Sequence, residues 1–171
     1  IGGQEWMFTN NIAKRILFAP PLQGADTLLI LSGYATPNMA SWLIKSFQEQ
    51  NMHPLNISLL IGMVPYDGLS VPIHEGFMEL HGKTYPKAVD SFSCSYVCEN
   101  PPVHANLYIW LKEESPVQAY TGSADFVQNA FIQSRKEIVV CCDPKEAYKF
   151  YEEVEANSIY CNHAEVEDHI A

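Results

Sequence analysis

The chain has 171 residues, of which 47% are hydrophobic and 18% are charged; this balance fits one globular domain and excludes a disordered polypeptide. No apolar run approaches the roughly 20 residues that a membrane-spanning helix needs, so we expect no membrane partner. Ten basic and twenty acidic residues give a formal net charge of −10, which excludes a strongly basic, free-standing nucleic-acid binder.

The first half of the chain is predicted to alternate between strands and helices. Residues 1–7 begin Ile1-Gly2-Gly3 without a Met, and we expect them to lie outside the fold as a tag or a disordered end. Short apolar runs indicate buried strands, and apolar residues at helical spacing indicate helices. The predicted elements are a strand over 27–31, a helix over 38–50, a strand over 57–63 and a helix over 74–81.

The second half is predicted to be richer in strands. We expect strands over 89–97, 103–111, 117–120 and 137–142, a hairpin connection over 112–116, and a helix or loop over 124–132. An amphipathic helix over 144–156 begins at Asp143-Pro144, an N-cap followed by a first-turn proline. Because we find no repeat and no linker, we predict a single α/β domain over residues 1–171.

The cysteines and histidines do not form a metal-binding pattern. The five cysteines are odd in number and lie mostly in apolar, strand-like sequence, which favours a reducing, cytoplasmic environment. Cys161 and His163 show no closed four-ligand spacing with the other cysteines. His74 and His81 lack the i, i+4 spacing of a zinc-protease helix. We therefore predict no metal.

Two polar side chains share one face of the strand predicted over 103–111. Side chains alternate in direction along a strand, so we expect His104 and Asn106 to point the same way, about 7 Å apart. The following strand ends in a turn of small residues, Gly122-Ser123-Ala124. There a backbone N–H and the Ser123 hydroxyl can hold a phosphate oxygen.

Together these residues resemble the phospholipase D (PLD) superfamily, whose motif is H-x-K, then G-S-x-N, then an acidic residue some dozen positions later. The corresponding residues are His104-Ala105-Asn106, Gly122-Ser123-Ala124-Asp125 and Glu137. With Leu31-Ser32-Gly33-Tyr34 and Leu107-Tyr108-Ile109-Trp110, they make roughly residues 8–160 similar to the catalytic domain of NgoFVII-type, BfiI-like restriction endonucleases. The resemblance implies an α/β sandwich of the PLD type, with a mixed central sheet and helices on both faces.

The resemblance also implies a metal-independent mechanism with no cofactor. In the family one histidine attacks the phosphorus to form a phosphohistidine, and a second protonates the leaving oxygen and later activates water. Because the chain has one such motif, the second histidine would come from another copy, in a homodimer with a shared active site. His104 would be nucleophile or acid, Ser123 would bind a phosphate oxygen, and Glu137 would orient a histidine of its own or the facing chain.

Two residues depart from the family motif. Asn106 stands in place of Lys, and a neutral amide cannot offset the charge that develops on the transferring phosphoryl group. Asp125 stands in place of Asn and adds a negative charge beside the phosphate. Lys112 lies too far along the same strand to substitute, about 20 Å from Asn106. The loss of one preorganised donor costs roughly 10²–10³ in rate, so we expect impaired activity or none.

We therefore predict the DNA-cleaving domain of a restriction endonuclease, with DNA as its partner. Because much of the acidity lies between residues 152 and 168, we expect a local groove or a separate DNA-recognition domain to supply the affinity for DNA. One alternative is a catalytically inactive PLD-like scaffold that dimerises or binds a phosphate-bearing partner. Another is a hydrolase of lipids or of small phosphodiester metabolites.

Overall fold

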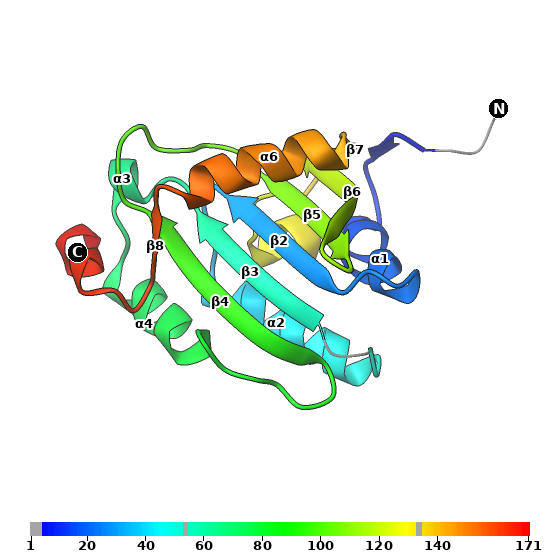
Figure 1. Cartoon of the computed structure of the whole chain (residues 1–171), viewed down its shortest axis with the longest axis horizontal. Helices are drawn as coiled ribbons and strands as arrows, with labels where there is room; N and C mark the ends of the chain where they lie inside the picture. The colour runs from blue at the N-terminus through cyan, green and yellow to red at the C-terminus, as the bar shows by residue number, and fades with distance from the viewer. Residues whose placement is uncertain (1–4, 53–54, 133–134) are drawn as a thin grey trace.

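The computed structural model describes residues 5–52, 55–132 and 135–171, and one mixed sheet runs through them (Figure 1). The strands are β1 (Met7–Phe8), β2 (Thr27–Ser32), β3 (Leu55–Ile61), β4 (Val89–Val97), β5 (Leu107–Lys112), β6 (Ser115–Gly122), β7 (Val139–Cys141) and β8 (Ser158–Tyr160). Their order in the sheet is β1-β7-β6-β5-β2-β3-β4-β8. β2, β3 and β4 are parallel, and the other neighbours are antiparallel.

Helices cover both faces of the sheet, which confirms the predicted sandwich. The helical segments are η1 (Lys14–Phe18), α1 (Ala19–Leu22), α2 (Pro37–Glu49), α3 (Val64–Asp67), α4 (Val71–Leu80), α5 (Gln128–Phe131), α6 (Pro144–Glu155) and η2 (Ala164–His169). In Figure 1, α6 crosses one face, and α2 and α4 lie behind the other. Within the described part of the chain, no helix has the length and apolar character needed to cross a membrane.

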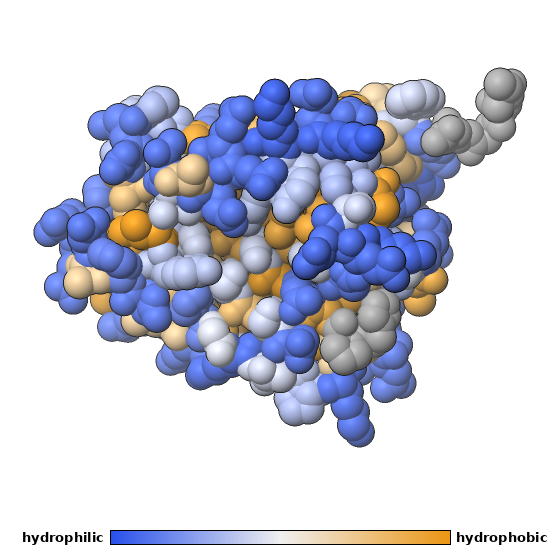
Figure 2. Space-filling model, viewed as in Figure 1, coloured by the Kyte–Doolittle hydropathy of each residue, from blue (hydrophilic) through white to orange (hydrophobic). Residues whose placement is uncertain are grey.

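The central strand β2 separates two apolar cores. Leu28 and Ile30 point into the larger core beneath η1, α2 and α4, whereas Leu29 and Leu31 point into a smaller core beneath α6. Each side chain of this size contributes about 1.5–3 kcal/mol when it is fully buried. The outer surface of α6 is hydrophilic (Figure 2). Burial on both faces explains why β2 is an uninterrupted apolar run.

Local capping fixes the two long helices where the sequence predicted them. Thr36 precedes Pro37, and its hydroxyl accepts a hydrogen bond from the Met39 N–H at 3.3 Å. At α6, a carboxylate oxygen of Asp143 accepts from the Glu146 N–H at 2.9 Å. Such caps satisfy N–H groups that the first helical turn leaves without a partner. α6 therefore begins at the predicted Pro144, and α2 begins at Pro37, one residue before the predicted start.

The prediction of a strand from residue 103 is wrong, because β5 begins at Leu107. The Val103 N–H donates instead to the Gly62 carbonyl at 2.8 Å, just beyond the end of β3. Gly62 allows this approach, since a Cβ there would lie 2.1 Å from the Val103 oxygen. Residues 103–106 consequently cross the strand ends, and His104 and Asn106 do not share one strand face.

Other differences concern short elements. β1, η1, α1, α3, β8 and η2 were not predicted, and each spans only two to six residues. Residues 1–4 lie outside the described residues, but Met7 pairs with Val140 in β1, so part of the presumed tag belongs to the sheet. The region 124–132 is mostly loop, with helix only in α5. The predicted hairpin is present, with Glu113 and Glu114 at positive φ.

Candidate active site

The predicted site residues lie at one edge of the sheet. β2 and β6 end there, at Ser32 and Gly122, and the antiparallel strands β5 and β7 begin there. Leu107 is paired with both Leu31 and Thr121. The residues that precede β5 and follow β6 are therefore neighbours in space although they are distant in sequence.

Asn106 is buried and connects three strand ends. Its Oδ1 accepts hydrogen bonds from the Ser32 hydroxyl at 3.1 Å and from the Gly33 N–H at 3.4 Å. Its Nδ2 donates to the Gly122 carbonyl at 3.2 Å. A lysine has no acceptor and could not replace the first two bonds. The residue in place of the family Lys is thus part of the structural framework of the site.

Asp125 lies in the loop after β6 with one carboxylate oxygen in an unusual environment. Its Oδ1 is buried and has no hydrogen-bond partner among the described residues. Burial raises the pKa of Asp125, and the nearby Asn106 amide and the charges of His104 and Arg135 oppose this rise. An ionised carboxylate without a partner is costly to bury. Asp125 therefore holds a proton more readily than an exposed carboxyl group.

Ser123 and Glu137 form a hydrogen-bonded pair beside this loop. The Ser123 hydroxyl donates to Glu137 Oε1 at 2.6 Å and accepts from the Ile138 N–H at 3.0 Å. The Ser123 N–H donates to the Ile138 carbonyl at 2.9 Å. Glu137 is only 8% exposed. The serine proton is thus directed at the glutamate, and the serine N–H already has a partner.

Arg135 is a functional candidate that the sequence reasoning missed. Its Nε forms an ion pair with Glu137 Oε2, and the arginine side chain is 46% exposed, against 5% for the glutamate. A guanidinium is permanently charged and matches the geometry of carboxylates and phosphates. The Arg135-Lys136 pair directly before Glu137, in a chain with ten basic residues, is a signal that could have revealed it.

His104 is exposed and lies across the end of β2. A Cβ at Gly33 would come within 2.9 Å of His104 Cδ2, so only glycine leaves room for the imidazole. The ring of Tyr34 meets the imidazole edge-on, with 5.9 Å between centroids. The Tyr34 hydroxyl in turn donates to Asp67, and this hydrogen bond raises the pKa of the tyrosine. A glycine and an anchored tyrosine therefore fix the position of the histidine.

Two hollows open at this edge. One of about 690 Å³ is lined by Thr9, Asn10, Ser123, Lys136, Glu137 and Ile138. A second of about 430 Å³ is lined by Val97, by residues 99–105, which include His104, and by part of α6. Glu137 bonds to Ser123 and Arg135 in the described residues, and no bond between Glu137 and His104 is present there. The structure thus joins Asn106 with Ser32 and Gly122, and Ser123 with Glu137.

Solved structures with a similar fold include one that is described as a phospholipase D family member. NucT from Helicobacter pylori aligns with a TM-score of 0.53 and 14% identity, covering 90% of this chain and 96% of that chain. Nuc, a phospholipase D family member from Salmonella typhimurium, aligns with a TM-score of 0.55 and 13% identity over 92% and 95%. Polyphosphate kinase from Porphyromonas gingivalis aligns at 0.51 and 11% over 95% and 26%. Identities this low show the fold alone.

The sequence itself identifies the family. It has no significant match among curated proteins. However, the family model of the NgoFVII restriction endonuclease N-terminal PLD domain matches residues 10–168, which include His104, Ser123 and Glu137. The chain is therefore a member of the NgoFVII restriction endonuclease N-terminal PLD domain family.

Proposed function

We propose that this chain is the DNA-cleaving domain of a restriction endonuclease and that it acts without a metal ion. The observation that carries the proposal is the exposed imidazole of His104, held over Gly33 at the same sheet edge as the Ser123–Glu137 pair. Membership of a restriction endonuclease family supports DNA as the substrate.

In the proposed reaction an imidazole nitrogen of His104 attacks the scissile phosphorus. A P–N bond forms as the P–O bond to the leaving oxygen breaks, and the histidine of a second copy donates the proton that this oxygen needs. That second histidine then takes a proton from water, and the water oxygen displaces His104 from the phosphorus. The site is therefore shared by a homodimer about a two-fold axis.

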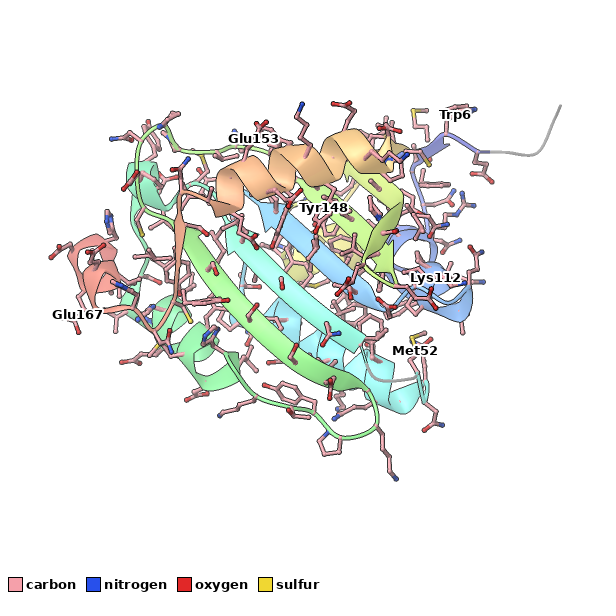
Figure 3. All side chains as sticks on the ribbon, in the orientation of Figure 1. Trp6, Met52, Lys112, Tyr148, Glu153 and Glu167 are labelled. Atoms are coloured by element: carbon pink, nitrogen blue, oxygen red, sulfur yellow. The ribbon has the colours of Figure 1, made fainter. Side chains whose placement is uncertain are left out.

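The neighbouring residues have supporting roles in this reaction. Ser123 binds a phosphate oxygen through its hydroxyl group. In the structure this hydroxyl donates to Glu137, and in the reaction it turns to donate to the phosphate oxygen instead. Glu137 orients a histidine of its own or the facing chain. Asn106 and Asp125 stand where the family has Lys and Asn, and the missing cation lowers the rate by roughly 10²–10³. Lys112 cannot replace it, because it lies against Gly24 at the hairpin end of β5 (Figure 3).

DNA affinity comes largely from a separate recognition domain, since the chain carries a formal charge of −10. We place the enzyme in the cytoplasm, where its five free cysteines would stay reduced.

The test compares the 171-residue chain with His104→Ala in EDTA. Plasmid DNA reports endonuclease activity, and bis(p-nitrophenyl) phosphate reports phosphodiester hydrolysis independently of DNA affinity. We expect slow turnover of both substrates by the unmodified chain and none by His104→Ala. Mass spectrometry at alkaline pH should detect the phosphohistidine. Cleavage abolished by EDTA would exclude the metal-independent mechanism, and equal cleavage by both proteins would exclude His104 as the nucleophile.

A catalytically inactive PLD-like scaffold is the second candidate function. It is favoured by Asn106, whose amide is committed to Ser32, Gly33 and Gly122. Asn106→Lys separates the two candidates in the same assays. A nuclease lacking only its cation should gain activity, whereas a scaffold should stay inert and still form dimers in analytical ultracentrifugation.

A further inference from the structure

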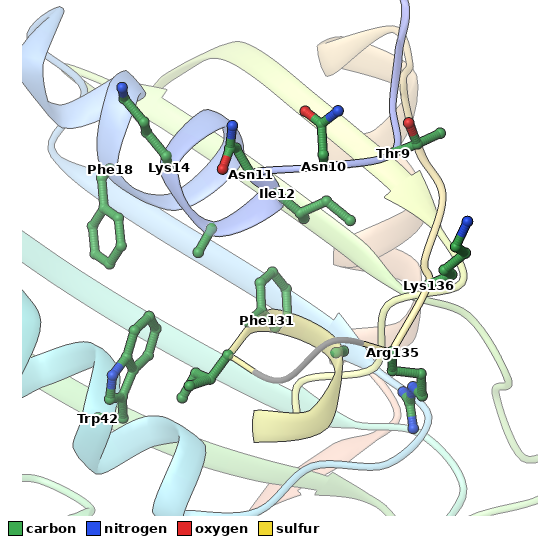
Figure 4. Close-up of a pocket in the computed structure, with 13 residues that line it drawn as sticks. Thr9, Asn10, Asn11, Ile12, Lys14, Phe18, Trp42, Phe131, Arg135 and Lys136 are labelled. Atoms are coloured by element: carbon green, nitrogen blue, oxygen red, sulfur yellow. The ribbon is translucent and has the colours of Figure 1, made fainter.

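A third hollow, referred to below as the groove, adjoins the hollow that contains Ser123 and Glu137. It has a volume of about 560 Å³ and lies between the segment before η1 and the segment around α5 (Figure 4). Thr9, Asn10 and Lys136 line both this groove and the hollow that contains Ser123 and Glu137. The two hollows are therefore adjoining parts of one surface depression.

The charge of this groove is opposite to that of the chain. Among the residues that the structure describes, its charged lining residues are Lys14, Arg135 and Lys136, with no Asp or Glu. The adjoining hollow adds Glu137, which is already paired with Arg135. Three of the ten basic residues of a chain with net charge −10 thus line one groove. Such local clustering attracts a polyanion despite an unfavourable overall charge.

Aromatic side chains line the part of the groove that lies away from Arg135 and Lys136. Phe18, Trp42 and Phe131 come from three different elements and are half-buried, and Figure 4 shows them apart from Arg135 and Lys136. Phe18 and Trp42 meet edge-on with centroids 5.8 Å apart. A cationic groove with accessible aromatic rings suits an unpaired nucleic-acid strand, because its bases can stack on the rings. In a duplex the bases are already stacked on one another.

We propose that this groove binds the strand being cut, in unpaired form, beside the scissile phosphodiester. Lys14 and Lys136 contact backbone phosphates, and a base stacks on Trp42. The assignment of this strand as a substrate rests on the proposed nuclease function, whereas binding of a single strand in the groove does not. The groove would accordingly supply part of the DNA affinity that the acidic chain otherwise lacks.

Fluorescence anisotropy with a labelled oligothymidylate of about 12 nucleotides, within the site sizes of about 4–16 that single-strand binders show, tests the proposal. All proteins carry His104→Ala so that the probe stays intact. The decisive variant is Lys14→Gln with Lys136→Gln. Its control is Lys83→Gln with Lys87→Gln, which removes the same charge from the segment between α4 and β4. Affinity is measured over a range of salt concentrations.

We expect the groove variant to weaken binding and to reduce the slope of log K against log salt by about 1.4, because each phosphate contact on a single strand contributes about 0.7. The control variant should keep the slope. Trp42→Leu, with its fold checked by circular dichroism, should weaken binding about tenfold, the effect of losing one stacked base.

Three results would overturn the proposal: no binding of the probe at low salt, equal slopes for the two lysine variants, or tighter binding of the corresponding duplex. Failure of the nuclease function would be distinct from these, since it would appear as absent cleavage by the chain with an intact His104 while the salt slopes still differed.

Discussion

Replacement of Gly33 by alanine is predicted to reduce catalysis with little effect on stability. The new Cβ would lie 2.9 Å from His104 Cδ2, and ordinary contacts begin at 3.4 Å, so the imidazole must move by about 0.5 Å. Misplacement by about 1 Å can cost 10²-fold in rate, so we expect about a tenfold loss. Because His104 is exposed, its ring can move without disturbing the core.

Two measurements check this prediction. The rate of bis(p-nitrophenyl) phosphate hydrolysis should fall about tenfold, and the thermal midpoint should change by less than about 4 °C, roughly 1 kcal/mol for a chain of this length. NMR should show a shifted Cδ2–H resonance for His104 among the six histidines. An unchanged rate and resonance, or a loss of activity that merely follows a loss of stability, would refute the reasoning.

Gly62→Ala, in contrast with Gly33→Ala, should destabilise the protein, because its Cβ would lie 2.1 Å from the backbone oxygen of Val103. Overpacking of this kind typically costs about 1–3 kcal/mol. Urea unfolding measures the loss of stability, and an unchanged free energy of unfolding would contradict the prediction. Asn106→Ala should lower the free energy of unfolding by about 1–3 kcal/mol, because it removes the hydrogen bonds that the amide makes with the Gly33 N–H and the Gly122 carbonyl. Urea titration measures this, and a change below about 0.5 kcal/mol, typical of surface substitutions, would count against it. Asp125→Asn should stabilise the protein at neutral pH. Burial raises the pKa of Asp125, so the ionised form is disfavoured in the fold, and the gain should disappear below the ordinary carboxyl pKa of 3.8, where the group is protonated in both states. A gain in stability that is as large below pH 3.8 as at neutral pH would contradict this explanation.

Local patterns predicted the elements whose causes are local. β2 is apolar on both faces, and α2 and α6 each begin at a capping residue followed by proline, so periodicity and capping were sufficient. The direction of His104 was not predictable in this way. It depends on the contact between Gly62 and Val103, residues that come together only when β3 and β5 occupy one sheet.

The motif indicated residues of the candidate site but not the hydrogen bonds between them. The motif indicated Ser123 and Glu137 as separate functional residues, but their direct hydrogen bond arises because Gly122 pairs with Val139 across β6 and β7. Arg135 was missed because the motif does not include it. The charge of an arginine matters here through its position beside Glu137, which the spacing of the motif does not encode.

The two departures from the family motif act together on the electrostatics of the site. One removes a cation at position 106 and the other adds an ionisable carboxyl group at position 125, so the site is more negative than the motif prescribes, by two charges when Asp125 is ionised. Arg135 and Lys136 oppose this negative charge from the rim of the site. Arg135 lowers the pKa of Asp125, and Lys136 lines both the groove and the hollow that contains Ser123 and Glu137. In the proposed reaction a cation at the rim would attract the DNA backbone, whereas the missing lysine would face the transferring phosphoryl group, where charge develops. On this reasoning the chain should bind the DNA strand better than it cleaves it. The Lys14→Gln/Lys136→Gln variant should lose binding, whereas Asn106→Lys should change the rate of cleavage.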